Sequence, residues 1–120
     1  MPKKKPPPFQ ELIDIVIQFR EERDWRKFHN PKDVAISLSL EAAELLEHFQ
    51  WKNEAEIKKH IQKNKKEIGD ELIDVLSWVL LLSHDLDIDL VDAFYKKKAQ
   101  DAKKYPVEKV KGKNKKYTEY

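Results

Sequence analysis

The sequence predicts an all-α protein of four to five helices, on the evidence of its composition, its periodicity and its helix-start residues. Charged residues make up 38% of the 120 residues and apolar residues 40%, with only two glycines. This mixture favours long helices over sheets. Apolar residues also recur at helical spacing. A chain of this length builds one small core, so we expect a single helical domain.

The N-terminal quarter is expected to hold a tail, a helix and a loop. Residues 1–8 (MPKKKPPP) contain three consecutive prolines, which favour an extended conformation, so this segment is predicted to be a disordered tail. The apolar spacing predicts a first helix from about Phe9 to Glu22. Residues 23–30 (RDWRKFHN) lack that period and carry Trp25, Phe28 and His29. An aromatic-rich loop is notable because loops usually expose their side chains.

Three polar residues are predicted to begin the later helices. Asn or Asp before a helix accepts a hydrogen bond from the first turn, and an acid three residues on completes a capping box. The predicted caps are Asn30 with Pro31 and Asp33, Asn53 with Glu56, and Asp89. The second helix is expected to reach about Gln50, and the last to run from Leu90 to Lys104 before Pro106. The helical domain is thus placed at residues 9–106, and 107–120 as a basic C-terminal tail.

The segment from 66 to 84 is predicted to be a helix that is apolar nearly all round. Its apolar members are Leu72, Ile73, Val75, Leu76, Trp78, Val79, Leu80, Leu81 and Leu82. Such a helix must be covered on every side, and so short a chain has little to cover it with. We therefore expect the bundle to be completed by oligomerisation, as a dimer or, in preference, a homotetramer. The sequence leaves open whether the preceding helix breaks before Gly69 or continues through it.

Composition also narrows the classes of function. The absence of cysteine excludes a disulfide scaffold, a zinc–thiolate site and a thiol nucleophile. No apolar stretch is long enough to span a bilayer and no signal-peptide pattern opens the chain, so we expect a cytoplasmic protein with no membrane partner. Basic residues lie towards both ends and acids in the middle. That layout fits nucleic-acid binding, solvated tails, or cations that hold a phosphate near a carboxylate–metal cluster.

Two groups of acids lie on helix stripes that otherwise point inward. Glu41 and Glu44 share one face of the second helix, while Glu71 and Asp74 lie on a line that continues into Trp78. Buried carboxylates do not stay ionised without a partner. A hard divalent cation, Mg²⁺ or alternatively Mn²⁺, suits such oxygen ligands. The competing interpretation is surface pairing with lysines, and the residues alone weigh the two about equally.

A di-iron carboxylate bundle is the rival metal site. It needs Glu-x-x-His pairs on two helices, and none of the histidines at 29, 48, 60 and 84 follows a Glu by three positions. Mg²⁺ is therefore preferred to iron. His48 and His60 are expected to face solvent.

The acids form an ordered pattern with other motifs along the chain. Glu41-Ala-Ala-Glu44 and Glu71-Leu-Ile-Asp74 are separated by 26 residues. Further motifs are 23–29 (RDWRKFH), 49–51 (FQW), 104–112 (KYPVEKVKG) and 116–119 (KYTE). Together these resemble the MazG-like all-α NTP pyrophosphohydrolases with their ExxE…ExxD signature, and within them the dCTP-pyrophosphatase branch. The resemblance covers the chain from residue 9 onwards.

The resemblance implies a MazG-like bundle and an Mg²⁺-dependent enzyme that converts a (deoxy)nucleoside triphosphate to its monophosphate and pyrophosphate. A dCTP-like substrate and a role in nucleotide-pool cleaning are its further implications. Glu41, Glu44, Glu71 and Asp74 would hold the metal, and Glu44 or Glu41 would orient or deprotonate the attacking water. This agrees with phosphoryl transfer in general, where cations neutralise charge while the nucleophile is positioned in line.

The same resemblance implies residues that bind the substrate. Lys97, Lys104 and Tyr105 match phosphate-side positions, Trp25 and Trp51 match aromatic positions of the base pocket, and His29 is expected either to cap a helix or to touch the base. The chain departs from the branch at two positions. Asp101 stands where Asn is common, and Val16 stands where a nucleotide-contacting histidine can occur. A cytosine preference is correspondingly less well supported.

Two alternatives compete with this interpretation. One is a non-catalytic helical interaction or nucleic-acid-binding module, in which the acids are surface charge; carboxylates on inward stripes argue against it, and no stable nucleic-acid partner is expected. The other is a related all-α phosphohydrolase that takes dUTP or a phosphoribosyl-ATP. The pair of Trp25 and Trp51 and the Tyr-Pro-Val-Glu-Lys segment at 105–109 favour the first interpretation.

Overall fold

The computed structural model describes residues 8–119, and within them every regular element is helical. The elements are α1 (Pro8–Glu22), η1 (Arg26–Phe28), α2 (Pro31–Glu47), α3 (Glu54–Asp85), α4 (Leu90–Lys104), α5 (Val107–Val110) and η2 (Tyr117–Glu119). The predicted all-α class is confirmed. Seven of the eight residues of the predicted N-terminal tail lie outside the described residues.

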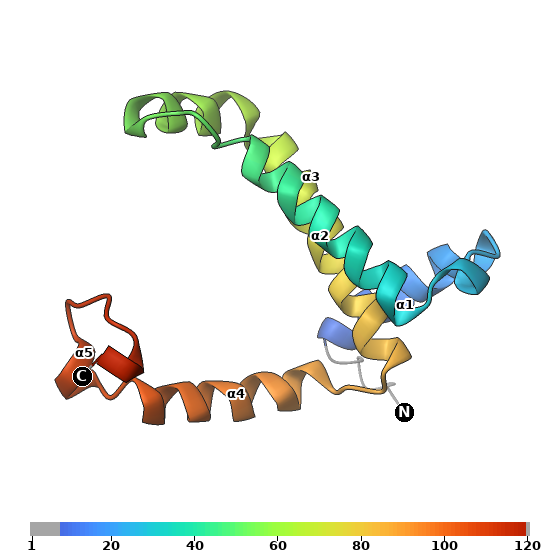
Figure 1. Cartoon of the computed structure of the whole chain (residues 1–120). Helices are drawn as coiled ribbons and strands as arrows, with labels where there is room; N and C mark the ends of the chain where they lie inside the picture. The colour runs from blue at the N-terminus through green and yellow to red at the C-terminus, as the bar shows by residue number, and fades with distance from the viewer. Residues whose placement is uncertain (1–7, 120) are drawn as a thin grey trace, which may run out of the picture. The chain divides into compact units, whose positions relative to one another are not determined.

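The chain divides into two compact units, residues 1–87 and residues 88–120. In the first unit α2 lies alongside α3, and α1 packs against α3 from another direction (Figure 1). This unit carries all four acids of the predicted metal site. The second unit holds α4, α5 and η2.

The predicted caps are confirmed by hydrogen bonds. The side-chain oxygen of Asn30 accepts from the backbone N–H of Asp33 at 2.9 Å, and Pro31 occupies the first turn of α2. Asn53 and Glu56 form the complete capping box that begins α3. These caps satisfy donors that have no partner within the helix, so local sequence determines where both helices begin.

The second helix ends earlier than predicted. α2 ends at Glu47 instead of Gln50, and the chain then turns through residues 48–51. Trp51 has a backbone φ of 65°, in the left-handed region that β-carbon-bearing residues rarely adopt. The turn that redirects the chain into α3 ends the helix at Glu47. The spacing of apolar side chains along the sequence does not indicate such a turn.

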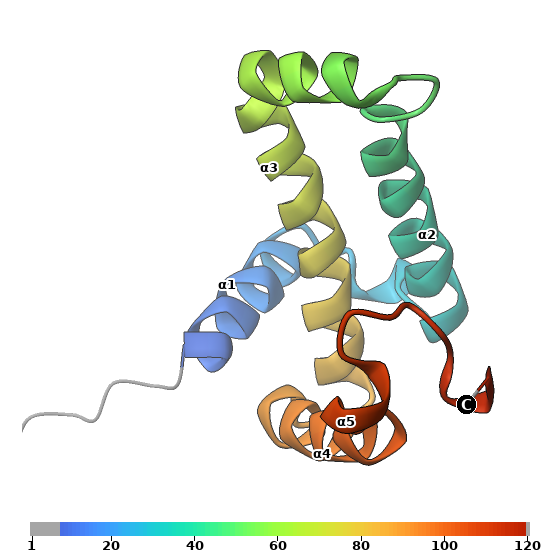
Figure 2. The ribbon, with the colours of Figure 1, turned by 90° about the vertical axis from the view of Figure 1, so that its left-hand side faces the viewer.

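The question left open at Gly69 is answered by a kink elsewhere. α3 runs through Gly69 without a break, but its backbone leaves helical geometry at Asn64 (φ −123°, ψ 26°). The Asn64 side chain donates to the carbonyl oxygen of His60 at 3.1 Å, which is the acceptor a regular helix would use for the backbone N–H of Asn64. Figure 2 shows the resulting bend between the first, light-green part of α3 and the yellow remainder.

The buried core of the described residues is small. Its apolar members are Val34, Leu80 and Leu81, and beside them lie the buried polar residues Arg20 and Ser83. Several large apolar side chains of the first unit stay exposed, among them Ile15, Phe19, Ile36, Leu40, Leu72 and Ile73. A single chain therefore leaves many of its large apolar side chains exposed to solvent.

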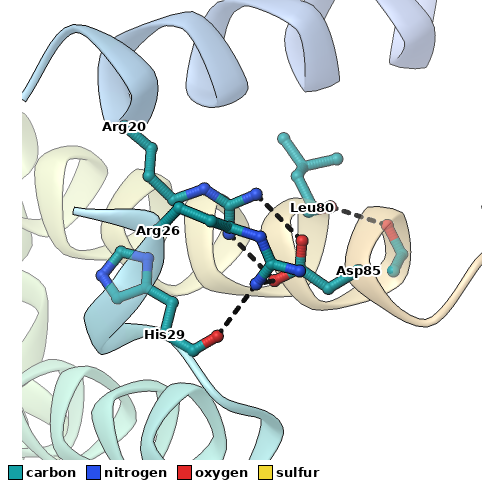
Figure 3. Close-up of polar contacts among 6 residues, drawn as sticks. Arg20, Arg26, His29, Leu80 and Asp85 are labelled. Atoms are coloured by element: carbon teal, nitrogen blue, oxygen red, sulfur yellow. Dashed lines mark hydrogen bonds and ion pairs between the residues drawn. The ribbon is translucent and has the colours of Figure 1, made fainter. Parts of the chain in front are cut away.

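A buried ion pair joins α1 to the end of α3. Both terminal nitrogens of Arg20 donate to the Asp85 carboxylate at 2.9 Å, and the side chains are only 2% and 5% exposed. Arg26, from the loop after α1, approaches the same carboxylate at 3.3 Å and donates to the backbone oxygen of His29 at 3.1 Å (Figure 3). One carboxylate thus fixes α1, α3 and the aromatic loop to one another.

In the second unit, the C-terminal segment folds back onto the end of α4. Asp89 caps α4 as predicted, accepting from the backbone N–H of Asp92 at 3.0 Å. The rings of Tyr105 and Tyr117 meet edge to face with centroids 6.0 Å apart, and the ammonium of Lys104 lies 5.0 Å from the centre of the Tyr117 ring.

Among the described helices none has both the length and the apolarity needed to cross a bilayer.

The buried ion pair yields a stability prediction. Asp85→Asn leaves the buried Arg20 charge without its counter-charge, so we expect a loss of about 3–5 kcal/mol in the free energy of unfolding. Burial alone would raise the pKa of Asp85, but the hydrogen bond and charge of Arg20, with Arg26, lower it overall. The stabilisation is therefore present above the unfolded pKa of about 3.9 and lost as pH falls through the lower folded value.

Urea denaturation at fixed protein concentration measures this effect. The matched control is Asp70→Asn on the same helix, which breaks the exposed Lys66–Asp70 pair and should change stability little. Equal losses in the two variants would contradict the role given to Asp85.

Candidate metal centre and nucleotide site

Three of the predicted metal ligands meet between two helices. Glu41 and Glu44 come from adjacent turns of α2, and Glu71 comes from the facing stretch of α3. Each offers one carboxylate oxygen, and these three oxygens lie within 4.8 Å of one another. Because the acids of α2 are three residues apart, they share the helix face that packs towards α3. We call Glu41, Glu44 and Glu71 the carboxylate cluster.

Two acids of the carboxylate cluster, Glu41 and Glu71, hold their protons more tightly than isolated acids do. Burial raises the pKa of Glu41, and a hydrogen bond with Glu44 and the charges of Glu44, Asp74 and Glu71 raise it further. Burial likewise raises the pKa of Glu71, with Glu44 and Asp74 acting in the same direction. Desolvation and like-charge repulsion both disfavour the ionised acids, and a cation held between them would offset the repulsion.

Two buried oxygens show where that cation would fit. Oε2 of Glu41 and Oε2 of Glu71 are buried and have no hydrogen-bond partner among the described residues. Buried polar atoms without partners are rare in folded proteins. Several close carboxylate oxygens are the donor set of a hard divalent cation such as Mg²⁺ or Mn²⁺. The residues present therefore fit such an ion.

Asp74 lies outside the three-oxygen group but near it. It follows Glu71 by three residues on α3, so it shares that face of the helix, and its charge contributes to the raised pKa of Glu41. Asp74 and Glu41 both line a cavity of about 400 Å³. The fourth predicted ligand thus lines this cavity together with Glu41 of the carboxylate cluster.

Aromatic side chains from α1, from the loop after it and from α3 line the same cavity, which we call the aromatic cavity; the one from α1 is Phe19. Trp25 and His29 come from the loop after α1, and Trp78 comes from α3. The rings of His29 and Trp78 meet edge to face with centroids 5.2 Å apart. Arg20 and Val16 of α1 also line the cavity. An apolar, aromatic cavity bordered by acids suits a ligand with a flat ring and an attached anion that binds through a metal.

The structure does not bring all the predicted substrate residues into this cavity. Trp51 follows α2, at the other end of that helix from Trp25, and is 90% exposed. Lys97, Asp101, Lys104 and Tyr105 belong to the second unit. Within that unit Asp101 is paired with Lys97 and, at 3.5 Å, with Lys98. The hydrogen bond from Lys97 holds the pKa of Asp101 below its usual range, although burial opposes this.

Comparisons with known proteins agree with the geometry. Residues 36–120 match the model of the MazG-like family. dCTP pyrophosphatase 1 of Rattus norvegicus is 33% identical over 115 residues, covering 94% of this chain and 68% of the relative. The Homo sapiens protein of the same name is 30% identical over the same shares. A crystal structure of a pyrophosphatase from Archaeoglobus fulgidus matches with a TM-score of 0.80 and 36% identity, over 88% of this chain and 99% of that one.

The chain belongs to the MazG-like family. The carboxylate cluster and Asp74 are the two acid pairs that carried the resemblance in the sequence. In this MazG-like chain both pairs lie on the α2–α3 pair, so the helix pairing in the first unit is what brings them together.

Sequence reasoning missed two groups beside the site. Arg20 falls within the predicted first helix but was given no role, yet it is buried and paired with Asp85, 65 residues away. No local pattern signals a partner at that distance. His48 and His60 were expected to face solvent, and this is wrong. Both are half-buried, and Nδ1 of His48 lies 2.8 Å from Nε2 of His60.

The raised pKa values of Glu41 and Glu71 predict how metal-free protein responds to pH. An acid with a raised folded pKa binds more protons folded than unfolded, so stability falls as pH rises above the unfolded value of about 4.3. We expect Glu71→Gln to remove part of that fall between pH 5 and pH 8 in the presence of a chelator. Thermal unfolding at both pH values measures it.

Glu67→Gln is the control, since Glu67 is exposed one turn earlier on α3 and lies outside the cluster. It should keep the wild-type pH dependence. Added Mg²⁺ should raise the wild-type melting temperature more than that of Glu71→Gln. An unchanged pH dependence in Glu71→Gln would show that ionisation of Glu71 does not lower the stability of the folded protein.

Proposed function

We propose that this chain is an Mg²⁺-dependent pyrophosphohydrolase that cuts a dCTP-like nucleoside triphosphate into its monophosphate and pyrophosphate. The observation that carries the proposal is the carboxylate cluster, in which three acids from two helices converge within 4.8 Å beside the aromatic cavity. Family membership supports the reaction class, since the chain is a MazG-like nucleoside triphosphate pyrophosphohydrolase. Mn²⁺ is the alternative ion.

The acids have distinct tasks in this proposal. Glu41, Glu44, Glu71 and Asp74 would hold the cation, which when bound neutralises phosphate charge and polarises the scissile linkage. A water oxygen attacks the α-phosphorus, and the bond from that phosphorus to the bridging oxygen breaks, releasing pyrophosphate. Glu44 or Glu41 orients this water and takes its proton. Glu44 is the more exposed of the two, and burial with the neighbouring acids raises the pKa of Glu41 in the metal-free chain.

The aromatic cavity would take the base. Trp25 offers a flat face for stacking, and His29 contributes a ring held against Trp78. Val16, at the position where the branch can carry a nucleotide-contacting histidine, adds apolar surface to the same lining. The phosphates would meet Lys97, Lys104 and Tyr105, as the family pattern implies. We propose 9–106 as the catalytic domain because it includes these positions.

The apolar surface of one chain supports an oligomer. Trp51 and the aliphatic residues Ile36, Leu40, Leu72 and Ile73 are half or more exposed. Exposed apolar surface on this scale marks an interaction surface. We propose a homotetramer, or a dimer, in which neighbouring copies cover these side chains and Trp51 reaches the base pocket of another copy. The proposed setting is nucleotide-pool cleaning in the cytoplasm.

Pyrophosphate release from a panel of NTPs and dNTPs tests the reaction. With Mg²⁺ in excess, wild-type protein should release pyrophosphate and a monophosphate, and fastest from dCTP or a modified form of it. Glu44→Ala and Asp74→Ala should each lose at least about 100-fold in rate, the scale of removing a group that stabilises or orients the transition state. The control Asp70→Ala, also on α3 but outside the cluster, should keep the wild-type rate. Full activity in Glu44→Ala would sink the proposed site.

Light scattering and fluorescence quenching test the oligomer. The mass should be four times, or for a dimer twice, the 14.3 kDa chain mass. In a variant carrying Trp25→Phe and Trp78→Phe, the only tryptophan left is Trp51. If a second copy covers Trp51, acrylamide should quench it weakly, although one chain alone leaves it 90% exposed. A monodisperse monomer with fully quenchable Trp51 would overturn this part of the proposal.

A further inference from the structure

Two histidines and an asparagine form a hydrogen-bonded row beside the carboxylate cluster. His48 lies just after α2, while His60 and Asn64 lie on α3 at the kink. Nδ1 of His48 is 2.8 Å from Nε2 of His60, and the side-chain nitrogen of Asn64 is 3.2 Å from Nδ1 of His60. The same Asn64 nitrogen lies 3.1 Å from the backbone oxygen of His60. None of these three residues carries a role in the reaction described above.

The row has a defined direction. A backbone oxygen only accepts hydrogen bonds, so the Asn64 atom that contacts it is the amide nitrogen, which only donates. Nδ1 of His60 must then accept, and an uncharged His60 carries its proton on Nε2. That proton goes to Nδ1 of His48, so an uncharged His48 carries its own proton on Nε2. Burial lowers the pKa of His60, with Lys52 and His48 adding to this, which keeps the ring uncharged at neutral pH.

A cavity that His48 lines also contains a carboxylate able to accept this proton. His48 and His60 line a cavity of about 390 Å³ together with Glu44, Glu47 and Glu71. Oε2 of Glu71 is buried and has no partner among the described residues. Burial chiefly raises the pKa of Glu71, but His48 acts on it in the opposite direction. Glu71 therefore offers a buried oxygen without a hydrogen-bond partner to a cavity that His48 also lines.

We propose that His48 is a positioning residue that donates its Nε2–H to Glu71 and so orients this carboxylate towards the cation of the carboxylate cluster. This rests on the proposed function, since it assumes that Glu71 holds that cation. The Asn64–His60 pair fixes the tautomer of His48, and the kink of α3 at Asn64 places the donor that starts the row. Residues that orient a metal ligand in this way typically change metal affinity 10–100-fold when removed.

The tautomers provide a test that needs no activity. Long-range ¹H–¹⁵N spectra of the full chain at about pH 8, well above the usual histidine pKa of about 6.5, report which ring nitrogen carries the proton. We expect Nε2–H for both His48 and His60, with signals assigned from the His48→Gln variant. A proton on Nδ1 of His48 would overturn the proposal, because its Nε2 would then accept hydrogen bonds or bind the metal itself.

Metal affinity separates positioning from simple packing. Calorimetry with Mg²⁺ alone should show affinity about 10-fold weaker in His48→Leu, whereas His48→Gln, whose amide can donate from near the Nε2 position, should stay close to wild type. His84→Leu, an exposed histidine on the last turn of α3, is the control and should bind Mg²⁺ normally. Equal affinity in His48→Leu and wild type, or loss of affinity in both His48 variants, would overturn the proposal.

The kinetic signature is a rise in the Mg²⁺ concentration needed for half-maximal pyrophosphate release by His48→Leu, with the rate at saturating Mg²⁺ nearly kept. A purely structural role would lower thermal stability without this change. If wild-type protein released no pyrophosphate, the proposed function would fail, but the tautomers and the calorimetry would still decide whether His48 orients Glu71.

Discussion

Mutual repulsion among carboxylates held on two helices is the constraint on which the rest of the first unit depends. One carboxylate oxygen from each of Glu41, Glu44 and Glu71 lies within 4.8 Å of the others. Burial raises the pKa of both Glu41 and Glu71. A chain selected only for stability would replace such acids, because desolvated like charges disfavour folding. The cation proposed to bind there would explain their presence on the interface of α2 and α3. The helix pairing must then be firm enough to hold the acids together before the cation arrives.

A second constraint lies at the C-terminal end of α3, where an ion pair fixes α1 and the loop after it to α3. The Asp85 carboxylate accepts hydrogen bonds from both terminal nitrogens of Arg20 and lies close to Arg26. Arg26 also donates a hydrogen bond to the backbone oxygen of His29. A buried pair of this kind adds little net stability compared with apolar packing, but its geometry is specific. Here it sets the position of the loop that carries Trp25 and His29. The wall of the aromatic cavity is thereby fixed to the helix that carries Glu71 and Asp74.

Features encoded by neighbouring residues were predictable, and features made by distant ones were not. The caps at Asn30, Asn53 and Asp89 follow from side chains within one helical turn of the groups they satisfy. The acid pairs were found because their spacing places them on one face. The early end of α2, the kink at Asn64 and the Arg20–Asp85 pair depend on tertiary packing, which periodicity does not report. The pairing of His48 with His60 was missed because it requires the turn at Trp51.

The conformation of Trp51 shows how the turn and the proposed assembly are linked. A tryptophan at φ 65° costs backbone strain that glycine would avoid, and its side chain is 90% exposed, so packing within the described chain does not repay that cost. The strain is understandable if the indole is covered by another copy. The same turn brings His48 against His60 beside Glu71. A single strained connection would then serve both the metal site of its own chain and the base pocket of a neighbour, which explains why an aromatic residue stands where the backbone favours glycine.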